Sequence, residues 1–421
     1  MGGAERVRRE QDERLRAMLA EVGARNPFYG RRLAAAGARA EDVQTVADLH
    51  RLPFLTKAEL VQDQLAHPPY GTTLTYPPDR YVRLHQTSGT TGRPLRVLDT
   101  EADWQWWGRC WAAVYAGAGV TAADRLYLAF SFGPFIGFWS AMEGARVVGA
   151  LAIPGGGLDT VERLRAIVDH DATVLLCTPT YALHLAETAE REGIPIRESA
   201  VRVTIHAGEP GASIPATQRR IEEAWGARCC DHYGMTELGA AGTPCPLRRD
   251  GMHLNEVEFI AEVIHPETGA TLPPGERGEL VMTNLGRWGS PVIRYRTGDV
   301  VAPEPGPCAC GSSYLFLRGG VVGRADDMVI VRGVNVFPSA IEAIVRDVPE
   351  VLEFQVEITK QRALDELCIR IEAESAGAAV AEKLTDLVRH RLGLRPVVEV
   401  APAGSLPRFE LKARRFRVRR D

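Results

Sequence analysis

The feature that most constrains the fold is a regular alternation of short apolar runs with amphipathic stretches, beginning at about residue 150. The amphipathic stretches lie at residues 161–168, from Tyr181 onward and around Ile221. Short apolar strands that alternate with helices are typical of βαβ units, which build a parallel sheet with helices on its faces. The sequence therefore predicts an α/β fold. The apolar runs are LAIPG, TVLLCTP, VRVTIHAGEP and RCCDHYGMTE.

Polar segments rich in glycine or proline directly follow three of these runs. They are Thr178-Pro179, residues 208–210 and residues 233–237. Ligands of parallel sheets bind outside the carboxyl ends of the strands. We therefore expect these three segments to lie together around a ligand.

The segments on either side of the parallel sheet predict further structure. Residues 5–22 carry apolar residues at helical spacing among charges, which predicts an amphipathic surface helix that stops at Gly23. Residues 256–300 are rich in strand and turn signals, which predicts an additional, smaller antiparallel β-sheet.

The character of the sequence changes again at residues 323–328. A strand, MVIVRG, follows, and then Pro338-Ser339 with Glu342 forms a capping-box pattern that starts a helix. Two more strands, a helix at residues 380–391 and the run VVEVA complete an α+β unit. We expect a large N-terminal domain of residues 1–325 and a small, mobile C-terminal domain of residues 326–421.

Composition limits the classes of function. The chain has 421 residues, a formal net charge of -4 and a sequence pI near 6.3, so nothing general favours nucleic acid or an anionic membrane as a partner. The segment MGGAERVRREQDERLRAML is too charged for a secretory signal, and no apolar run approaches the length of a membrane span. We expect a cytoplasmic protein with eight reduced cysteines.

The most informative short segment is TSGTTGRP, residues 87–94, in which hydroxyls alternate with glycines. Such a loop can present backbone N–H groups and hydroxyls to an anion. It is not a Walker loop, because the G-x-x-x-x-G-K-S/T spacing is missing. Composition alone leaves two interpretations open, a phosphate-binding loop and a plain turn.

Five further motifs follow this loop along the chain: HYGMTE at residues 232–237, YRTGD at 295–299, GRADDM at 323–328, RGVNVFPSAIE at 332–342, and LPRFELKARR near the end. With these motifs in this order, the chain resembles the phenylacetate-CoA ligase branch of the adenylate-forming superfamily, the acyl-CoA synthetases and AMP-binding enzymes. The resemblance implies ATP-dependent adenylation of a carboxylic acid, followed by transfer of the acyl group to CoA.

The resemblance also implies roles for single residues. Tyr233 would lie against adenine, and Asp299 with Arg324 would hold the ribose. Thr236 would contact the α-phosphate, and Glu237 would ligate Mg²⁺. The β- and γ-phosphates of ATP would be held by Thr87, Ser88, Gly89, Thr90, Thr91, Gly92 and Arg93, the last at a position where the family more often has lysine. The other nucleotide-binding positions would be Gly208, Glu209, Pro210, His232 and Gly234.

Three C-terminal positions complete this set. Lys412 would act with Thr236 and Glu237 in adenylation, Asp326 would be the hinge between the domains, and Gly333 would let the pantetheine of CoA approach. Other interpretations stay open, because Lys412 lies in an arginine-rich tail that could be a solvated charge run or a surface for an anionic partner. Gly333 could equally serve a β-bulge or a turn.

A second group of residues suggests a metal site. Cys245 and His253, followed by Cys308 and Cys310, offer four ligands suited to tetrahedral zinc. The alternative is a Pro-Cys-Ala-Cys-Gly turn with free thiols and an ordinary strand histidine. Because some members of the resembling branch carry a comparable cluster, we expect one structural zinc ion.

The pocket for the acid is expected in the aromatic and glycine-rich segment FSFGPFIGFW, residues 130–139, and in the segment that enters Tyr233. Such a lining suits a flat aryl or arylacetic acid better than an aliphatic acid, although the same side chains could simply pack a core. The expected pocket residues are Phe132, Phe135, Ile136, Trp139, Ala207, Tyr233 and Gly234.

The expected reaction has competitors. The acyl-adenylate could be passed to an acyl carrier protein or a nitrogen nucleophile instead of CoA. The chain could also be an inactive nucleotide-binding regulator, or an anion-binding protein that acts through its basic tail. We expect a monomer or a homodimer that uses ATP, Mg²⁺ and CoA.

Overall fold

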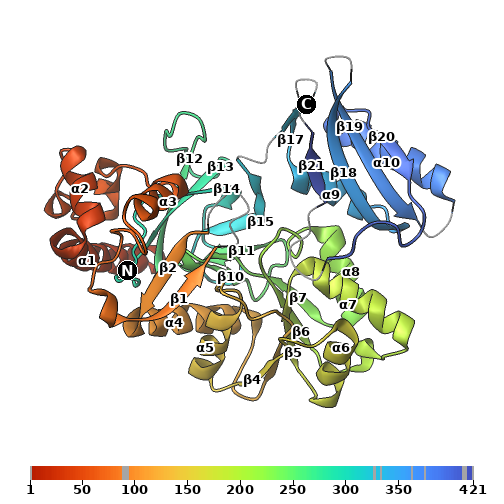
Figure 1. The fold of residues 1–421 in the computed structure, drawn as a ribbon, viewed down its shortest axis with the longest axis horizontal. Coiled ribbons are helices and arrows are strands. Elements are labelled where there is room, and N and C mark those ends of the chain that lie inside the picture. The colour runs from red at the N-terminus through yellow and green to blue at the C-terminus, as the bar shows by residue number, and fades with distance from the viewer. Residues whose placement is uncertain are drawn as a thin grey trace.

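The structure is a computed structural model that describes residues 2–87, 94–325, 329–331, 334–361, 364–373, 376–409 and 415–419. Figure 1 shows the N-terminal helices at one end of the molecule, the parallel sheet with its helices below the centre, and the C-terminal unit at the other end. Within the described residues, no helix is both long enough and apolar enough to cross a membrane.

The predicted parallel sheet is present, and its strands lie in the order β4-β3-β5-β6-β7. Strands β5 and β6 are buried along their whole length, which is why they read as continuous apolar runs. The sheet also begins earlier than predicted, with β3 at Arg125–Leu128. The other strands are β4 (Leu151–Pro154), β5 (Val174–Cys177), β6 (Val203–His206) and β7 (Arg228–Asp231), and the helices are α5 (Trp139–Val148), α6 (Thr160–Asp169), α7 (Pro179–Glu192) and α8 (Pro215–Trp225).

Local capping fixes where the helices of this sheet begin. Asp159 and Glu162 form a capping box at the start of α6. At the start of α7, the Thr178 side chain accepts a hydrogen bond from the Tyr181 backbone N–H at 3.1 Å, and Pro179 occupies the first helical position. Strand β5 is therefore joined to α7 by Thr178 alone, which keeps the start of α7 at the carboxyl edge of the sheet.

The predicted antiparallel sheet is also present and is larger than expected, with the strand order β10-β11-β15-β14-β13-β12. Its neighbours pair antiparallel throughout. The strands are β10 (Gly242–Pro244), β11 (Gly251–Leu254), β12 (Phe259–Ile264), β13 (Gly278–Asn284), β14 (Tyr295–Glu304) and β15 (Phe316–Arg324). A two-stranded ribbon, β8 (Gly234–Met235) with β9 (Gly239–Ala240), precedes it.

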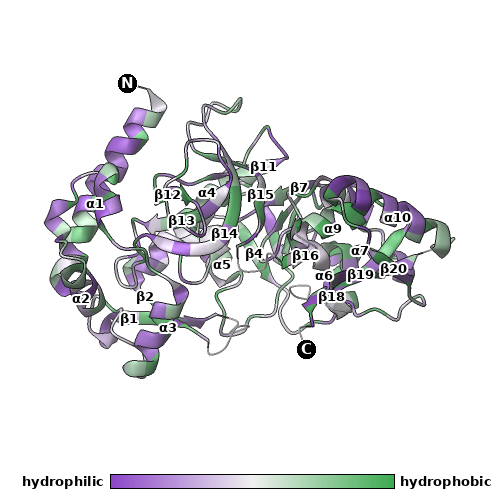
Figure 2. Cartoon of the chain, turned by 90° about the horizontal axis from the view of Figure 1, so that it is seen from above, coloured by the Kyte–Doolittle hydropathy of each residue, from purple (hydrophilic) through white to green (hydrophobic). Residues whose placement is uncertain are grey.

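The first helix is longer than predicted, because α1 (Gly3–Arg25) continues through Gly23. A Cβ atom on Gly23 would lie 2.7 Å from the Cβ of Ala40, so this glycine permits close packing and does not end the helix. Figure 2 shows hydrophilic and hydrophobic residues interleaved along α1, as an amphipathic helix requires. Its buried residues are Val7, Gln11, Leu15, Met18, Leu19 and Val22.

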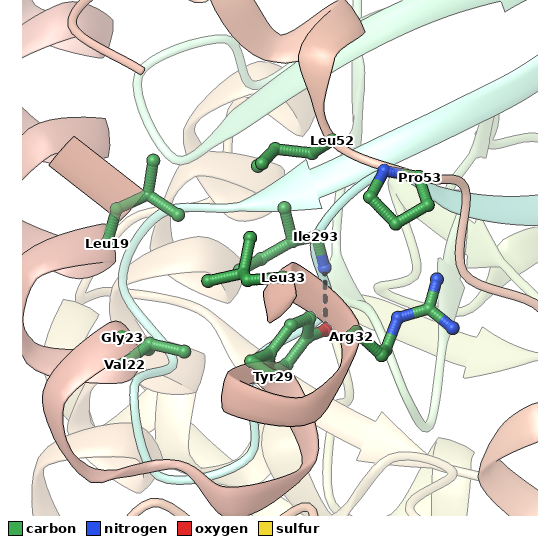
Figure 3. A pocket seen from close by; sticks show the side chains of 9 residues that line it. All are labelled: Leu19, Val22, Gly23, Tyr29, Arg32, Leu33, Leu52, Pro53 and Ile293. Carbon is green, nitrogen blue, oxygen red and sulfur yellow. Dashed lines mark hydrogen bonds between the residues drawn. The ribbon is translucent and has the colours of Figure 1, made fainter. Parts of the chain in front are cut away.

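A small apolar pocket lies where α1 and α2 (Pro27–Ala35) meet the segment before β14. Figure 3 shows the Tyr29 hydroxyl in hydrogen-bond contact with the backbone N–H of Ile293, at 3.0 Å. The same hydroxyl donates to the Pro291 carbonyl at 3.1 Å. The apolar contacts of this pocket and the two hydrogen bonds of Tyr29 fix the N-terminal helices to the large sheet.

Among the remaining N-terminal elements, helix α4 carries four buried tryptophans. Helix α4 begins with a capping box formed by Thr100 and Asp103. It buries Trp104, Trp106, Trp107 and Trp111. The elements are α3 (Lys57–Ala66), β1 (Tyr81–Gln86), β2 (Arg96–Thr100) and α4 (Glu101–Ala118), with short 3₁₀ turns at Ala40–Asp42, Val46–Arg51, Pro78–Arg80 and Ile196–Glu198.

The C-terminal unit has its own four-stranded sheet, in the order β20-β19-β18-β21, and its own apolar core. Its first helix corrects the predicted capping box: α9 starts at Pro338 after Phe337, and the Ser339 hydroxyl donates to the Val322 carbonyl instead of capping the helix. The elements are β16 (Val329–Val331), β17 (Val334–Val336), α9 (Pro338–Arg346), β18 (Val351–Gln361), β19 (Leu364–Ala373), α10 (Gly377–Leu392), β20 (Val397–Val400) and β21 (Phe416–Val418).

Arginines join the C-terminal unit to the helices of the parallel sheet. Arg415 is buried, forms a two-pronged ion pair with Glu353 at 2.6 and 2.9 Å, and donates to the Thr180 hydroxyl at 3.1 Å. The Nε atom of Arg408 lies 3.5 Å from Oε2 of Glu187 in α7. These contacts join Arg415 and Arg408 to α7, whose first turn lies at the carboxyl edge of the parallel sheet.

Candidate active site

The three polar segments predicted to meet do lie at the carboxyl edge of the parallel sheet, since they follow β5, β6 and β7. The backbone N–H of Thr180 donates to Glu209 at 2.9 Å, which joins the first segment to the second. Gly208 has φ of 97°, a conformation that favours glycine. Ala207 and Pro210 belong to the same turn.

Tyr233, Asp299 and Arg324 are brought together from distant parts of the sequence. The Tyr233 hydroxyl donates to Asp299 Oδ2 at 2.8 Å, and both side chains are buried. Arg324 faces Asp299 across the β14–β15 pairing, with Nη1 3.5 Å from Oδ1. Burial raises the pKa of Tyr233 well above its usual value, so its hydroxyl stays a neutral donor to the carboxylate.

Glu237 is buried beside a second tyrosine and a lysine. The Tyr295 hydroxyl donates to Glu237 Oε1 at 2.7 Å, and Lys57 Nζ lies 3.4 Å from the same oxygen. Backbone hydrogen bonds from Leu55 to Arg294 and from Arg296 to Leu55 fix the segment before Lys57 against β14.

Sequence reasoning missed Lys57, although a signal was present. Thr56 and Glu59 form a capping box, so Lys57 is the first residue of α3. A cation at a helix N-terminus is disfavoured by the helix dipole. Such a residue is a candidate for binding an anion, and its position beside Glu237 supports that interpretation.

A buried ion pair lies under the HYGMTE motif. Arg287 Nη1 donates to the Thr236 carbonyl at 2.8 Å, and Arg287 Nε donates to Asp99 Oδ1 at 2.7 Å. Both charged side chains are fully buried. Asp99 also accepts from the indole N–H of Trp107 at 3.3 Å. The backbone at Thr236 is therefore held by groups far away in the sequence.

Of the seven predicted phosphate-binding residues, Thr87 to Arg93, the structure describes only Thr87. This residue and Leu95 close the base of the loop, because the Thr87 N–H donates to the Leu95 carbonyl and the Leu95 N–H donates to the Thr87 hydroxyl, both at 3.0 Å. The loop thus connects strands β1 and β2 of a hairpin. The other predicted residues that lie outside the described residues are Ser88, Gly89, Thr90, Thr91, Gly92, Arg93, Asp326, Gly333 and Lys412.

The aromatic side chains of residues 130–139 pack on one another. Phe130 contacts Phe135 and Phe138 edge to face, with ring centroids 5.3 and 5.0 Å apart. Phe132 contacts Trp139 at 4.9 Å, and Trp139 is 38% exposed. Ile136 is buried within the same segment. The aromatic cluster therefore runs from the interior to the surface.

The four predicted zinc ligands also meet. Their ligand atoms all lie within 4.8 Å of one another, although Cys245 and His253 belong to the β10–β11 hairpin and Cys308 and Cys310 to the loop before β15. Cys245 Sγ lies 3.9 Å from Cys308 Sγ, and His253 Nε2 lies 3.4 Å from Cys310 Sγ. This is a compact three-sulfur, one-nitrogen cluster.

The comparisons with known proteins agree with this geometry. The family model described as "AMP-binding enzyme" matches residues 8–286, and the model for the C-terminal domain of such enzymes matches residues 333–420. The phenylacetate-coenzyme A ligase of Thermus thermophilus is 32% identical over 96% of this chain and 95% of its own length. The phenylacetate-coenzyme A ligase of Pseudomonas putida is 33% identical over 97% of this chain and 93% of its own length.

Among solved structures, 2-hydroxyisobutyryl-CoA ligase in the postadenylation state superposes with a TM-score of 0.93, at 32% identity, over 99% of this chain and 90% of that chain. The same enzyme in the thioesterification state gives a TM-score of 0.75 over the same shares of the two chains. The present structure is thus closer to the postadenylation form. The chain belongs to the AMP-binding enzyme family and, within it, to the AMP-forming acid–CoA ligases.

Proposed function

We propose that the chain activates an aryl or arylacetic acid with ATP, forms an acyl-adenylate and pyrophosphate, and then transfers the acyl group to CoA with release of AMP. The observation that carries the choice of an aryl acid is the aromatic cluster of residues 130–139, which lies next to the carboxyl edge of the parallel sheet. The two phenylacetate-coenzyme A ligases that match along nearly their whole length support it.

In this proposal, Asp299 and Arg324 hold the ribose, because a carboxylate can accept hydrogen bonds from both ribose hydroxyls. Tyr233 orients Asp299 and lies against adenine, with Gly234 beside it. Thr236 contacts the α-phosphate. The β- and γ-phosphates are held by the loop that starts at Thr87, and their negative charge attracts the cation of Lys57, which the sequence interpretation had not included.

Adenylation needs little covalent help from the protein. The carboxylate of the acid is already a nucleophile at neutral pH, so the site must align it with the α-phosphorus and offset the repulsion between two anions. Glu237 is an oxygen donor of the kind that Mg²⁺ prefers, and it is held in place by Tyr295. A bound Mg²⁺ would supply positive charge at the phosphates. Lys412 supplies a further positive charge, in addition to Lys57 and the metal ion.

Two domains fit this chemistry, residues 1–325 and residues 326–421, with Asp326 as the hinge. After adenylation, rotation about this hinge replaces Lys412 by the strand of Gly333 and opens a path for CoA. The competing proposal is transfer of the acyl group to a carrier protein or a nitrogen nucleophile. A cytoplasmic location and a monomeric or homodimeric state complete the proposal.

The function is tested by measuring acid-dependent exchange between pyrophosphate and ATP in the presence of Mg²⁺. We expect aryl acids to exceed acetate and propionate by at least about tenfold in kcat/KM, because a matched apolar pocket contributes this much discrimination. Added CoA should convert the reaction to net thioester formation. Failure of every acid in a broad panel would remove the catalytic proposal and favour an inactive nucleotide-binding regulator, whereas a preference for acetate would remove only the aryl acid.

We also propose that the cluster of Cys245, His253, Cys308 and Cys310 holds one structural zinc ion. Two thiolates bound to the same zinc at about 2.3 Å in tetrahedral geometry lie about 3.8 Å apart, close to the 3.9 Å between Cys245 and Cys308. His253 Nδ1 is 3.2 Å from the Tyr314 carbonyl and donates to it, which leaves the Nε2 lone pair on the side of Cys310. Such a site ties two loops of the large sheet together.

Elemental analysis of chelator-washed, untagged protein is expected to find about one zinc ion per chain. Cys308→Ser should lower both zinc content and melting temperature, because metal binding to a closed site is coupled to folding. Cys368→Ser is the matched control, since Cys368 is a free cysteine in β19 away from the cluster. If the metal-free wild type melts at the same temperature as the metal-bound protein, the cluster is a turn with free thiols.

A further inference from the structure

His232 lies where the sheet edge meets the aromatic cluster. It follows β7 directly and is buried. Its ring lies 4.4 Å from the ring of Trp111 in α4, and Trp111 in turn contacts Phe138 at 5.9 Å. His232 is therefore connected through Trp111 to the segment proposed to bind the acid. The resemblance names His232 as a nucleotide-binding residue, and His232 also belongs to the segment entering Tyr233 that is expected to line the acid pocket.

The hydrogen bonding of His232 fixes its tautomer. Nδ1 lies 2.7 Å from the carbonyl oxygen of Gly242. A carbonyl can only accept a hydrogen bond, so Nδ1 carries the proton. Burial lowers the pKa of His232 to about 4, so the ring is neutral at physiological pH. Nε2 therefore presents a lone pair and can only accept.

No residue that the structure describes donates a hydrogen bond to Nε2 of His232. Within the described residues, the hydrogen bond of His232 through its side chain is the one from Nδ1. Nε2 would lie 3.3 Å from a Cβ atom on Gly234, and Gly234 itself is exposed. Nε2 therefore lies beside the backbone of Gly234, an exposed residue that is also one of the expected pocket residues.

A purely structural histidine explains only half of this arrangement. The Nδ1 bond joins the end of β7 to β10, but this structural role does not require an acceptor at Nε2. A site that hydrogen-bonds its substrate has such an acceptor. It then rejects analogues that lack the donor much more strongly than a difference in size alone would permit.

We propose that His232 is a specificity-determining residue whose Nε2 accepts a hydrogen bond from a donor group on the acid, so that the substrate is a hydroxy- or amino-substituted acid. This inference rests on the proposed function, since it requires that the chain adenylates a carboxylic acid. It adds a polar recognition element to a pocket that is otherwise apolar.

The test compares acids that differ only in the donor. Pyrophosphate exchange is measured for each ring position of hydroxybenzoate and hydroxyphenylacetate, against the matching methyl acids, which have similar size, and the methoxy acids, which keep the oxygen but lose the donor. The pair 2-hydroxyisobutyrate and pivalate adds an aliphatic comparison. At one position, the hydroxy acid should exceed both analogues by at least about tenfold in kcat/KM.

Two variants link this preference to His232. His232→Asn can keep the donor to Gly242 while it removes the distal acceptor, and His232→Gln can place an amide oxygen near the position of Nε2. We expect the hydroxy-over-methyl preference to fall below about threefold in the Asn variant and to be partly restored in the Gln variant. Thermal melting checks that both are folded, and the readout is the ratio of hydroxy-acid to methyl-acid kcat/KM within each variant, so that a general loss of activity cancels.

Two results overturn the inference and leave the proposed function intact: equal use of hydroxy and methyl acids by the wild type, or a preference that is the same in the wild type and the Asn variant. If only the aliphatic pair shows a preference that depends on His232, the inference holds and the aryl acid is wrong. Absence of exchange with every acid removes both proposals.

Discussion

Arg287→Met is expected to destabilise the protein by about 3–5 kcal/mol, the usual cost of breaking a buried ion pair by removing one partner. Asp99 and Arg287 are both fully buried, so the variant leaves a carboxylate in the core without its cation. The Thr236 carbonyl loses its donor as well. Chemical denaturation followed by circular dichroism measures the free energy of unfolding.

An exposed ion pair is the control. Arg146 pairs with Glu143 on the surface of α5, with 68% of the arginine side chain exposed. Arg146→Met should therefore change the free energy of unfolding far less than Arg287→Met does. The double variant Asp99→Leu/Arg287→Met should recover part of the lost stability, because the buried charge is gone. Equal effects of Arg287→Met and Arg146→Met would contradict the assignment of this pair as a structural element of the site.

The sequence predicts the parallel sheet well because its signal is local. Strands buried on both faces, such as β5 and β6, must be apolar along their length, and the helices between them must be amphipathic. Strand β3 was missed, although it lies inside the sheet between β4 and β5. Its four residues are followed by an aromatic segment and not by a helical pattern, so the βαβ signal is absent there.

Element boundaries failed where tertiary contacts override a local rule. The local rule predicts that the helix stops at Gly23, yet this glycine lies inside α1, where the missing Cβ atom allows close packing against Ala40. The local rule predicts that Ser339 caps the helix, yet its hydroxyl donates a hydrogen bond to the carbonyl of Val322 in β15. Phe337 is the residue at the N-cap position of α9. In both cases the deciding partner is remote in the sequence.

The same limit applies to the site. The order of the motifs predicts Tyr233, Glu237 and Asp299 as site residues, because each belongs to a short contiguous motif. The contacts of Glu237 with Lys57 and of Thr236 with Arg287 join residues 180 and 51 positions apart, respectively, and no local pattern encodes them. The Cys and His cluster was predictable for a different reason, since few other functions use these residue types together.

Lys412→Ala is expected to lower the rate of adenylation by about 10²-fold or more, the scale of losing one preorganised electrostatic contact to the developing charge. It should spare thioester formation from supplied acyl-AMP. The reason is geometric, because one small domain cannot present Lys412 and the strand of Gly333 to the same site at once if they lie on different faces. Pre-steady-state measurement of each half-reaction separates the two steps.

The position of Arg415 supports this expectation for the adenylation step. Its ion pair with Glu353 and its hydrogen bond to Thr180 hold the described chain three residues after Lys412 against the edge of the parallel sheet, in a structure that is closer to the postadenylation than to the thioesterification state of a solved acid–CoA ligase. Arg417→Ala is the matched control, because Arg417 belongs to the same basic tail but is exposed, and it should leave both rates unchanged.

Asp326→Pro, which fixes φ at the hinge, should favour one half-reaction over the other. If Lys412→Ala instead lowers both half-reactions equally while the protein stays folded, the two-conformation mechanism is wrong and Lys412 serves only as a general anion-binding residue.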